Sequence, residues 1–218
     1  MDVFALMRQL QRRLFPPRDV IEGYEQSELV EMVFQKTKAF VPEGDWPLMA
    51  GVASVLDFGG GCGLHYKLAR RQSPEIRWAV VETPAMAQRA AELATERLRF
   101  FADIDEARNW LGAPEIMHSN GALQYTPEPR LTLQKLCSLK ASRMCWDRVL
   151  LSNSGWQREV QSSFLTDNGP GRDTRAREKL VKYGRTWIPE VEFLAAHDGY
   201  DLTERGNDWF RFSLKPST

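Results

Sequence analysis

The sequence has few cysteines, no net charge and no long apolar run. Its three cysteines, Cys62, Cys137 and Cys145, are odd in number and widely spaced, so they imply no disulfide framework and suit a reducing cytoplasm. The 29 basic residues balance 29 acidic residues, which argues against a dedicated nucleic-acid-binding protein. No apolar run approaches the ~20 residues of a membrane span, and the N-terminus lacks the apolar core of a secretory signal. We therefore expect a cytoplasmic protein that neither spans a membrane nor is exported.

The length of the chain bounds its architecture. With 218 residues, 43% of them hydrophobic, it suffices for one sizeable α/β domain and is short for two. No internal repeat or low-complexity segment occurs. We expect an N-terminal helical cap or extension over residues 1–50 and a main domain over 51–218, within which 152–187 form an insertion or lid.

The most informative stretch is a strand, a glycine turn and a helix. Ser54 to Phe58 reads as a short buried strand, and the pattern from Leu64 to Arg71 is helical. Between them lie four glycines, which permit positive φ angles and close approach of a ligand to the backbone: Gly59, Gly60, Gly61 and Gly63. Dinucleotide enzymes use G-x-G-x-x-G, and here Leu64 stands where the third glycine belongs, so a pyrophosphate turn is the weaker interpretation. The alternative is a tight turn with a purely structural role that binds no ligand.

Asp57 precedes the first glycine by two residues, and the run D-x-G-x-G-x-G resembles motif I of the class I S-adenosylmethionine-dependent methyltransferases. The resemblance implies S-adenosylmethionine as cofactor, with Asp57 serving its amino-acid half. A second acid, Glu82, ends the expected strand Ile76–Val81, 19 positions after Gly63 and close to the ~20 expected of a ribose-binding acid. Glu82 and the following Thr83 are therefore candidate cofactor-binding residues, and a solvated carboxylate is the alternative for Glu82.

Two further strand ends match the same family. The expected strand Leu98–Phe101 leads to Asp103 and Ile104, which the resemblance places at the adenine; capping of the next helix is an equal alternative for Asp103. After the expected strand Ile116–Ser119, the run Asn120 to Tyr125 resembles the segment beneath the sulfonium, which implies contacts from Asn120 and Leu123.

Methylation of an exocyclic base nitrogen is disfavoured, because Asn120-Gly121 lacks the two prolines of the N6-adenine enzymes. His118 is the best-placed histidine for a general base, although within a strand it is more often a core residue. Tyr24, ahead of the first strand, could touch the cofactor or belong to the core or surface.

The second half of the chain is expected to select the acceptor. A fifth strand, Met144 to about Leu151, is interrupted by Asp147-Arg148, which either reaches the active edge or forms an internal salt bridge. We include Arg148 with His118 among the catalytic candidates. Ser152 to Arg185 reads as a long irregular loop, and loops of this length are usually functional or disordered. Its basic residues suggest an anionic acceptor, with a solvated loop as the alternative: Arg172, Arg175, Arg177, Lys179, Lys182 and Arg185.

The two ends of the chain show further helices and a hairpin. Residues 2–15 form an expected amphipathic basic helix, which either docks on a partner or membrane surface or, as we favour, packs on the domain itself. A second helix spans Ser27 to Phe40. A late helix runs from Trp187 to about Gly199, and Tyr200–Arg205 with Asp208–Leu214 forms a closing hairpin.

Together these elements predict an α/β, Rossmann-like class I methyltransferase fold: a seven-stranded, mostly parallel sheet with a C-terminal antiparallel hairpin and helices on both faces. The chain is similar to small bacterial methyltransferases associated with surface-polysaccharide biosynthesis, a likeness carried by Asp57–His65, Ser119–Tyr125 and Asp147-Arg148. We expect methyl transfer, as O-methylation, to a small-molecule or glycan-type acceptor, without a metal and in a monomer or homo-oligomer. A nicotinamide-dependent oxidoreductase and a non-catalytic S-adenosylmethionine-binding scaffold are the alternatives.

Overall fold

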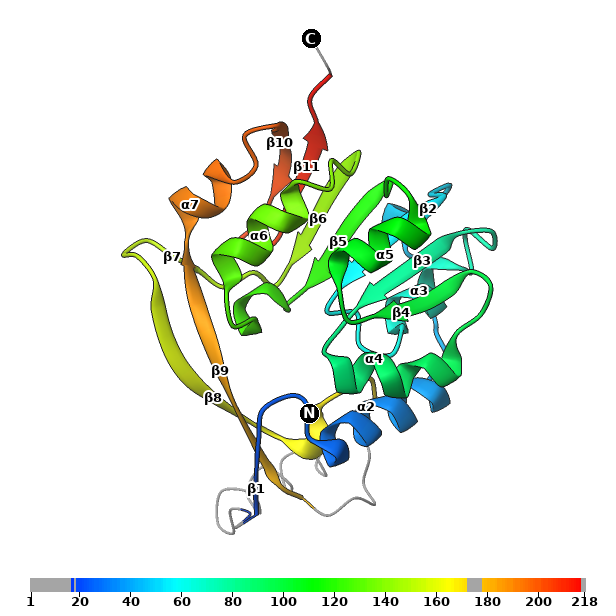
Figure 1. The fold of residues 1–218 in the computed structure, drawn as a ribbon, viewed down its shortest axis with the longest axis vertical. Helices are drawn as coiled ribbons and strands as arrows, with labels where there is room; N and C mark the ends of the chain where they lie inside the picture. The colour runs from blue at the N-terminus through cyan, green and yellow to red at the C-terminus, as the bar shows by residue number, and fades with distance from the viewer. Residues whose placement is uncertain (1–16, 18, 172–177, 217–218) are drawn as a thin grey trace.

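A seven-stranded sheet forms the centre of the computed structural model, which describes residues 17, 19–171 and 178–216 (Figure 1). Its strand order is β10-β11-β6-β5-β2-β3-β4, in which β6 to β4 run parallel and β11 runs antiparallel to both of its neighbours. The strands are β2 (Ser54–Phe58), β3 (Arg77–Val81), β4 (Leu98–Phe101), β5 (Ile116–Asn120), β6 (Arg143–Asp147), β10 (Tyr200–Arg205) and β11 (Phe210–Leu214). The predicted sheet and its C-terminal hairpin are confirmed.

Helices cover both faces of this sheet. One face packs on α5 (Ile104–Leu111), α6 (Pro129–Cys137) and α7 (Glu190–Ala195), and the other packs on α3 (Leu64–Ala69). Beside α3, α2 (Ser27–Ala39) packs on α4 (Pro84–Ala90). Short 3-10 turns complete the set: η1 (Pro47–Met49), η2 (Ala91–Leu93), η3 (Leu123–Tyr125) and η4 (Leu165–Asp167). Because successive strand residues alternate between faces, Leu56 and Met117 join the α5–α7 core while Val55 and Ile116 join the α3 core.

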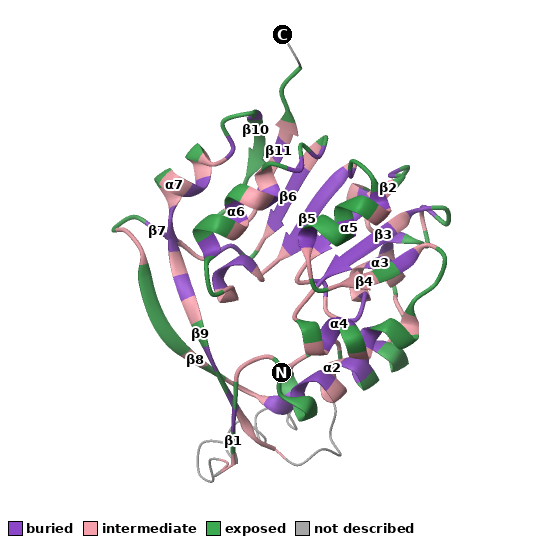
Figure 2. Cartoon of the chain, viewed as in Figure 1, coloured by how far each residue is buried: buried purple, intermediate pink, exposed green. Residues whose placement is uncertain are grey.

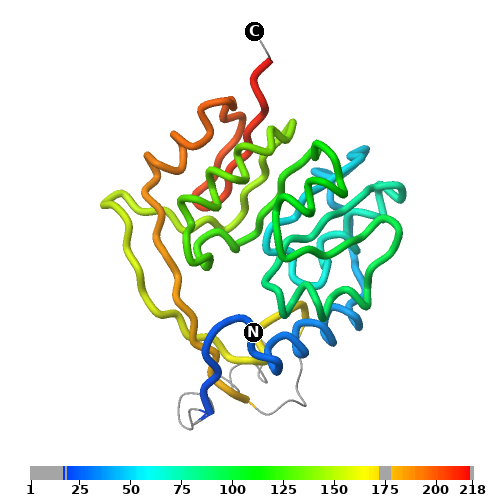
Figure 3. Tube along the Cα trace, viewed as in Figure 1, coloured from blue at the N-terminus to red at the C-terminus, as the bar shows by residue number. Residues whose placement is uncertain are grey.

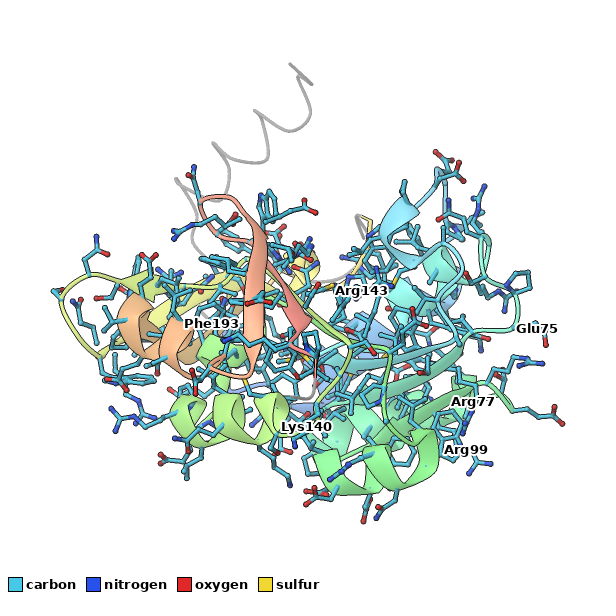
Figure 4. The ribbon with its side chains drawn as sticks, turned by 90° about the horizontal axis from the view of Figure 1, so that it is seen from above. Glu75, Arg77, Arg99, Lys140, Arg143 and Phe193 are labelled. Carbon is cyan, nitrogen blue, oxygen red and sulfur yellow. The ribbon has the colours of Figure 1, made fainter. Side chains whose placement is uncertain are left out.

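Large side chains of α5 and α7 pack against the sheet. Phe193 of α7 is fully buried and its ring lies 5.1 Å from that of Phe210 on the hairpin (Figure 4). Near the other end of the sheet, Arg77 and Arg99 both lie over the ring of Trp110 on α5, at 4.6 and 5.5 Å, and Figure 4 shows these two arginines beside each other. Arg77 begins β3, so this basic pair belongs to the amino ends of the strands and stabilises the packing of α5.

A second, smaller sheet forms a long ribbon at the side of the molecule (Figure 1). It contains β1 (Val20–Glu22), β7 (Leu151–Ser152), β8 (Gln157–Phe164) and β9 (Leu180–Pro189), with β8 antiparallel to β9 along its whole length. The prediction of an irregular stretch from Ser152 to Arg185 is therefore wrong. Most of β8 is exposed (Figure 2), so its residues lack the apolar alternation that marks a half-buried strand. The late helix begins at Glu190 and not at the predicted Trp187, because Trp187 still belongs to β9.

The far end of the ribbon is fixed to α2. Lys36 of α2 is buried, and its Nζ donates hydrogen bonds to the carbonyl oxygens of Thr166 at 2.9 Å and Asn168 at 2.7 Å. Lys179 pairs with Glu28 at 2.6 Å. Because a buried ammonium needs such partners, these contacts hold the ribbon against α2 and close one side of the molecule.

Some predictions lie outside the described residues. They are the amphipathic helix of residues 2–15 and the basic residues Arg172, Arg175 and Arg177. Within the described ranges, no helix is both long and apolar enough to cross a membrane.

Candidate functional site

The carboxyl ends of the parallel strands meet at one edge of the sheet, where most of the predicted site residues come together. The glycine turn follows β2, with positive φ at Gly59 (+74°), Gly61 (+58°) and Gly63 (+82°). A Cβ on Gly59 would lie 2.0 Å from Cβ of Ala122, and a Cβ on Gly60 would lie 2.4 Å from Oδ2 of Asp57. Backbone conformation thus favours glycine at 59, 61 and 63, and close packing requires it at 59 and 60.

Glu82 closes over this turn from the end of β3. Its Oε1 accepts a hydrogen bond from the Gly61 N–H at 3.0 Å, and its Oε2 accepts one from the Thr83 N–H at 2.9 Å. Burial raises the pKa of Glu82, and the two backbone hydrogen bonds oppose that rise. The turn and the strand-end acid, which the sequence predicted separately, form one site. The hydroxyl of Thr83 is buried without a hydrogen-bond partner within the described chain.

Asp57 lies beneath the turn rather than at its surface. Its side chain is fully buried and accepts hydrogen bonds from His118 Nδ1 at 2.7 Å, Trp78 Nε1 at 3.1 Å and His65 Nδ1 at 3.2 Å. Burial alone would raise its pKa, but the two imidazoles hold the pKa well below its usual range. In this structure Asp57 supports the glycine turn and two histidines, and a contact with the amino-acid half of the cofactor stays a prediction.

His118 is a core residue in this structure, as the alternative interpretation held. It is fully buried, with Nδ1 on Asp57 and Nε2 3.5 Å from Asp147 Oδ2. Burial would lower its pKa, but the charges and hydrogen bonds of Asp57 and Asp147 outweigh burial and raise the pKa to about 9. The raised pKa favours the protonated imidazole, which has no lone pair with which to accept a proton, and the catalytic role of His118 stays a prediction.

Asn120 and Arg148 lie at the exposed end of the same network. Arg148 Nε donates to Asn120 Oδ1 at 2.5 Å, and its Nη2 donates to the Asn120 carbonyl at 3.2 Å. Arg148 has a φ of +53°, which costs a non-glycine residue of order 1 kcal/mol or more and often marks a functional position. Asp147 ends β6 and pairs with Arg211 at 2.6 Å. The sequence left two arrangements open for Asp147-Arg148, and each residue follows a different one. Arg148 reaches the carboxyl edge, whereas Asp147 forms an ion pair with Arg211 of β11.

At the predicted adenine position, Asp103 caps α5. Its Oδ1 accepts hydrogen bonds from the N–H groups of Asp105 at 2.7 Å and Glu106 at 3.1 Å, and Lys135 contacts its other oxygen at 3.1 Å. Ile104 is 6% exposed and packs in the core. The hydrogen bonds agree with the capping interpretation, and an adenine contact stays a prediction.

Three tyrosines pack on one another where η3 meets β9 of the ribbon. Tyr24 packs on Tyr183 of β9 at 4.4 Å between centroids and on Tyr125 of η3 at 5.4 Å. Burial and the charges of Tyr183, Tyr125 and Glu82 raise the pKa of Tyr24, so its hydroxyl stays protonated near Glu82. The Tyr125 hydroxyl donates to Gln161 Oε1 on β8 at 2.8 Å. Sequence reasoning proposed Tyr24 but missed Tyr183, because nothing in its pattern revealed a ribbon strand. Leu123, also predicted, begins η3, is 1% exposed and packs in the core.

His65 is the other residue that sequence reasoning missed. It is the second residue of α3, and Asn120 Nδ2 lies 3.3 Å from its Nε2. The spacing D-x-G-x-G-x-G-x-H was the available signal, because a strand, a tight turn and a helix bring the first and last residues of that run together. Asp57, His65 and His118 offer nitrogen and oxygen atoms within 4.8 Å of one another, a set that could hold a metal ion. Their mutual hydrogen bonds also account for the cluster without a metal.

No protein-family model matches the chain, and no curated protein matches it. Solved structures do. The CcbJ methyltransferase from Streptomyces caelestis aligns over 88% of this chain and 100% of its own, with 13% identity and a TM-score of 0.52. The chain has the class I methyltransferase fold.

Two other solved structures align over nearly the whole of this chain. The N-terminal domain of EvdMO1, determined in the presence of S-adenosylhomocysteine and D-fucose, covers 99% of this chain and 98% of its own at 16% identity, with a TM-score of 0.49. The 1,6-didemethyltoxoflavin-N1-methyltransferase of Burkholderia thailandensis, with its acceptor and S-adenosylhomocysteine bound, covers 98% and 86% at 15% identity, with a TM-score of 0.49. At such low identity, these likenesses concern the fold.

Proposed function

We propose that this chain is an S-adenosylmethionine-dependent methyltransferase that O-methylates a small-molecule or glycan-type acceptor. The observation that carries the proposal is the contact between the glycine turn and Glu82 at the carboxyl ends of β2 and β3. A carboxylate there keeps acceptor capacity for the two ribose hydroxyls, while the turn admits a ligand close to its backbone. Asp103 and Ile104 would stand at the adenine end, and Asn120 at the methionine end.

S-adenosylmethionine supplies the methyl group from its sulfonium, so the protein chiefly aligns the acceptor and removes its proton. Glu82 and the glycine turn orient the cofactor, Thr83 and Tyr24 adjoin it, and Leu123 supports η3 beneath it. A nicotinamide oxidoreductase is less well supported, because Leu64 replaces the third glycine and β11 runs antiparallel.

The acceptor site lies between the carboxyl edge and the ribbon in this proposal. Arg148 at the edge, and Arg185 of β9, favour an acceptor or carrier that bears a phosphate or carboxylate, as in a nucleotide-linked sugar. Much of the basic character expected of this segment is already neutralised in the described chain, since Lys179 pairs with Glu28 and Arg185 pairs with Glu159 at 2.5 Å. Arg148 is therefore the stronger candidate for anion recognition. A role in bacterial surface-polysaccharide biosynthesis, cytoplasmic location and homo-oligomerisation belong to the same proposal.

Calorimetry tests the part of the proposal that concerns cofactor binding. Wild type should bind S-adenosylhomocysteine, Glu82→Ala should bind it much more weakly, and the exposed matched control Glu106→Ala should bind it normally, with all three folded by circular dichroism. Tight NADH binding without any response to S-adenosylhomocysteine would refute the proposal. A screen of labelled cofactor with cell extract, polysaccharide precursors and free sugars then separates an enzyme from a binding scaffold.

A further inference from the structure

His65 is the histidine whose position suits chemistry at the carboxyl edge. The chain has three histidines. His118 and His197 are 0% and 2% exposed, whereas the side chain of His65 is 16% exposed. His65 follows the glycine turn at the start of α3, so it belongs to the same short segment as the proposed cofactor contacts.

The hydrogen bonds around His65 determine its tautomer. Arg148 can only donate, so the Asn120 atom that faces its Nε at 2.5 Å must be the carbonyl oxygen. The amide nitrogen of Asn120 then faces His65 Nε2 at 3.3 Å and donates to it, so that Nε2 carries a lone pair. The proton of the neutral imidazole is consequently on Nδ1, which donates to Asp57 Oδ2 at 3.2 Å.

Asp57 is well placed to stabilise a charged imidazole. Its carboxylate is fixed by Trp78 and by the protonated His118, whose ring centroid lies 4.7 Å from that of His65. The other groups facing His65 are the Trp46 ring, at 5.5 Å, and Arg148 beyond Asn120. Asp57 is therefore the carboxylate that contacts His65; it also contacts His118, whose other ring nitrogen faces Asp147.

We propose that His65 is the general base of the methyl-transfer step. The inference rests on the proposed function. The acceptor oxygen bonds to the methyl carbon, the carbon–sulfur bond breaks with its electron pair going to sulfur, and the hydroxyl proton passes to His65 Nε2. The imidazolium keeps its Nδ1–H on Asp57 and later releases the new proton to water. Asn120 holds Nε2 toward the edge until the acceptor hydroxyl takes its place, and Asp57 is a positioning residue.

Chemical labelling tests the position of His65 without knowledge of the acceptor. Diethyl pyrocarbonate reacts with neutral imidazole, and peptide mass spectrometry identifies the modified residue. We expect modification at His65 and none at His118 or His197 in the folded chain, faster labelling in Asn120→Ala, and slower labelling when S-adenosylhomocysteine is bound. Labelling of His65 that is absent, or that is unaffected by bound S-adenosylhomocysteine, would overturn the proposal.

Kinetic measurements test the chemistry, with the acceptor that the screen identifies as substrate. His65→Gln should lower kcat by about 10²–10⁴-fold, abolish the rise of rate with pH, and leave S-adenosylhomocysteine affinity unchanged. Arg70→Gln, at the exposed residue that follows α3, is the control. Equal turnover and an equal pH profile in His65→Gln would overturn the base assignment alone, whereas failure of wild type to bind S-adenosylhomocysteine would refute the proposed function. Loss of activity with EDTA, together with one bound metal per wild-type chain and none in His65→Gln, would instead make the cluster a metal site.

Discussion

The buried pair of Asp57 and His118 should make the stability of the protein depend on pH. The pKa of His118 rises from 6.5 to about 9 on folding, which corresponds to about 3 kcal/mol of stabilisation. A histidine whose pKa is raised contributes fully below its unfolded pKa, and the contribution is lost as pH rises through the folded pKa. The free energy of unfolding should therefore fall by about 3 kcal/mol between about pH 6.5 and 9.5.

Asp57→Asn removes the charge that holds His118 and keeps the side-chain volume. Loss of one partner of a buried ion pair costs about 3–5 kcal/mol, a large share of the 5–15 kcal/mol typical of a domain. Urea unfolding of wild type and variant, at several pH values, measures both effects. Asp201→Asn, an exposed substitution on β10, is the matched control. The reasoning is refuted if wild-type stability is flat over this pH range, or if Asp57→Asn is as stable as the control.

Three other outcomes follow from the packing. His197 accepts a hydrogen bond from Trp146 Nε1 at 2.9 Å, and burial lowers its pKa to about 4. The free energy of unfolding should therefore also fall as pH drops from 6.5 toward 4, and urea unfolding of His197→Asn should not show this decline. Gly59→Ala should abolish S-adenosylhomocysteine binding, and Ala122→Gly should partly restore it by removing the Cβ that would lie 2.0 Å away, as calorimetry can check. Lys36→Met removes the hydrogen bonds to the carbonyls of Thr166 and Asn168 and should cost about 2–4 kcal/mol in urea unfolding.

The parallel half of the fold was predictable because its signals are local. β2 and β4 begin and end at the expected residues, since each is a short run of mainly apolar residues. The pairing of Glu82 with the glycine turn followed from the same logic, because carboxyl ends of adjacent parallel strands meet at one edge.

The roles of the histidines could not be predicted, because they depend on contacts between residues distant in the sequence. His118 and His197 are both buried, yet one lies between two carboxylates and is protonated, while the other accepts an indole N–H and is neutral. A sequence pattern that marks a residue as buried carries no information on which charges surround it. The ribbon was missed for a similar reason: β8 is stabilised by its ladder to β9 and not by an apolar face of its own.

The placement of the ribbon separates two tasks within the fold. Strands β7 to β9 of the ribbon lie in the sequence between β6 and α7. A change in the length of this segment would therefore alter the surroundings of the carboxyl edge without altering the central sheet. The cofactor contacts we propose, at the glycine turn and Glu82, lie on the first two strands of that sheet and do not depend on the ribbon. Among the proposed cofactor contacts, Tyr24 does depend on the ribbon. It packs on Tyr183 of β9, and the charge of Glu82 contributes to the raised pKa of its hydroxyl. Tyr125 of η3 also packs on Tyr183 and donates to Gln161 of β8, so contacts of these two tyrosines connect the two halves, and we expect any dependence of acceptor selection on bound cofactor to pass through them.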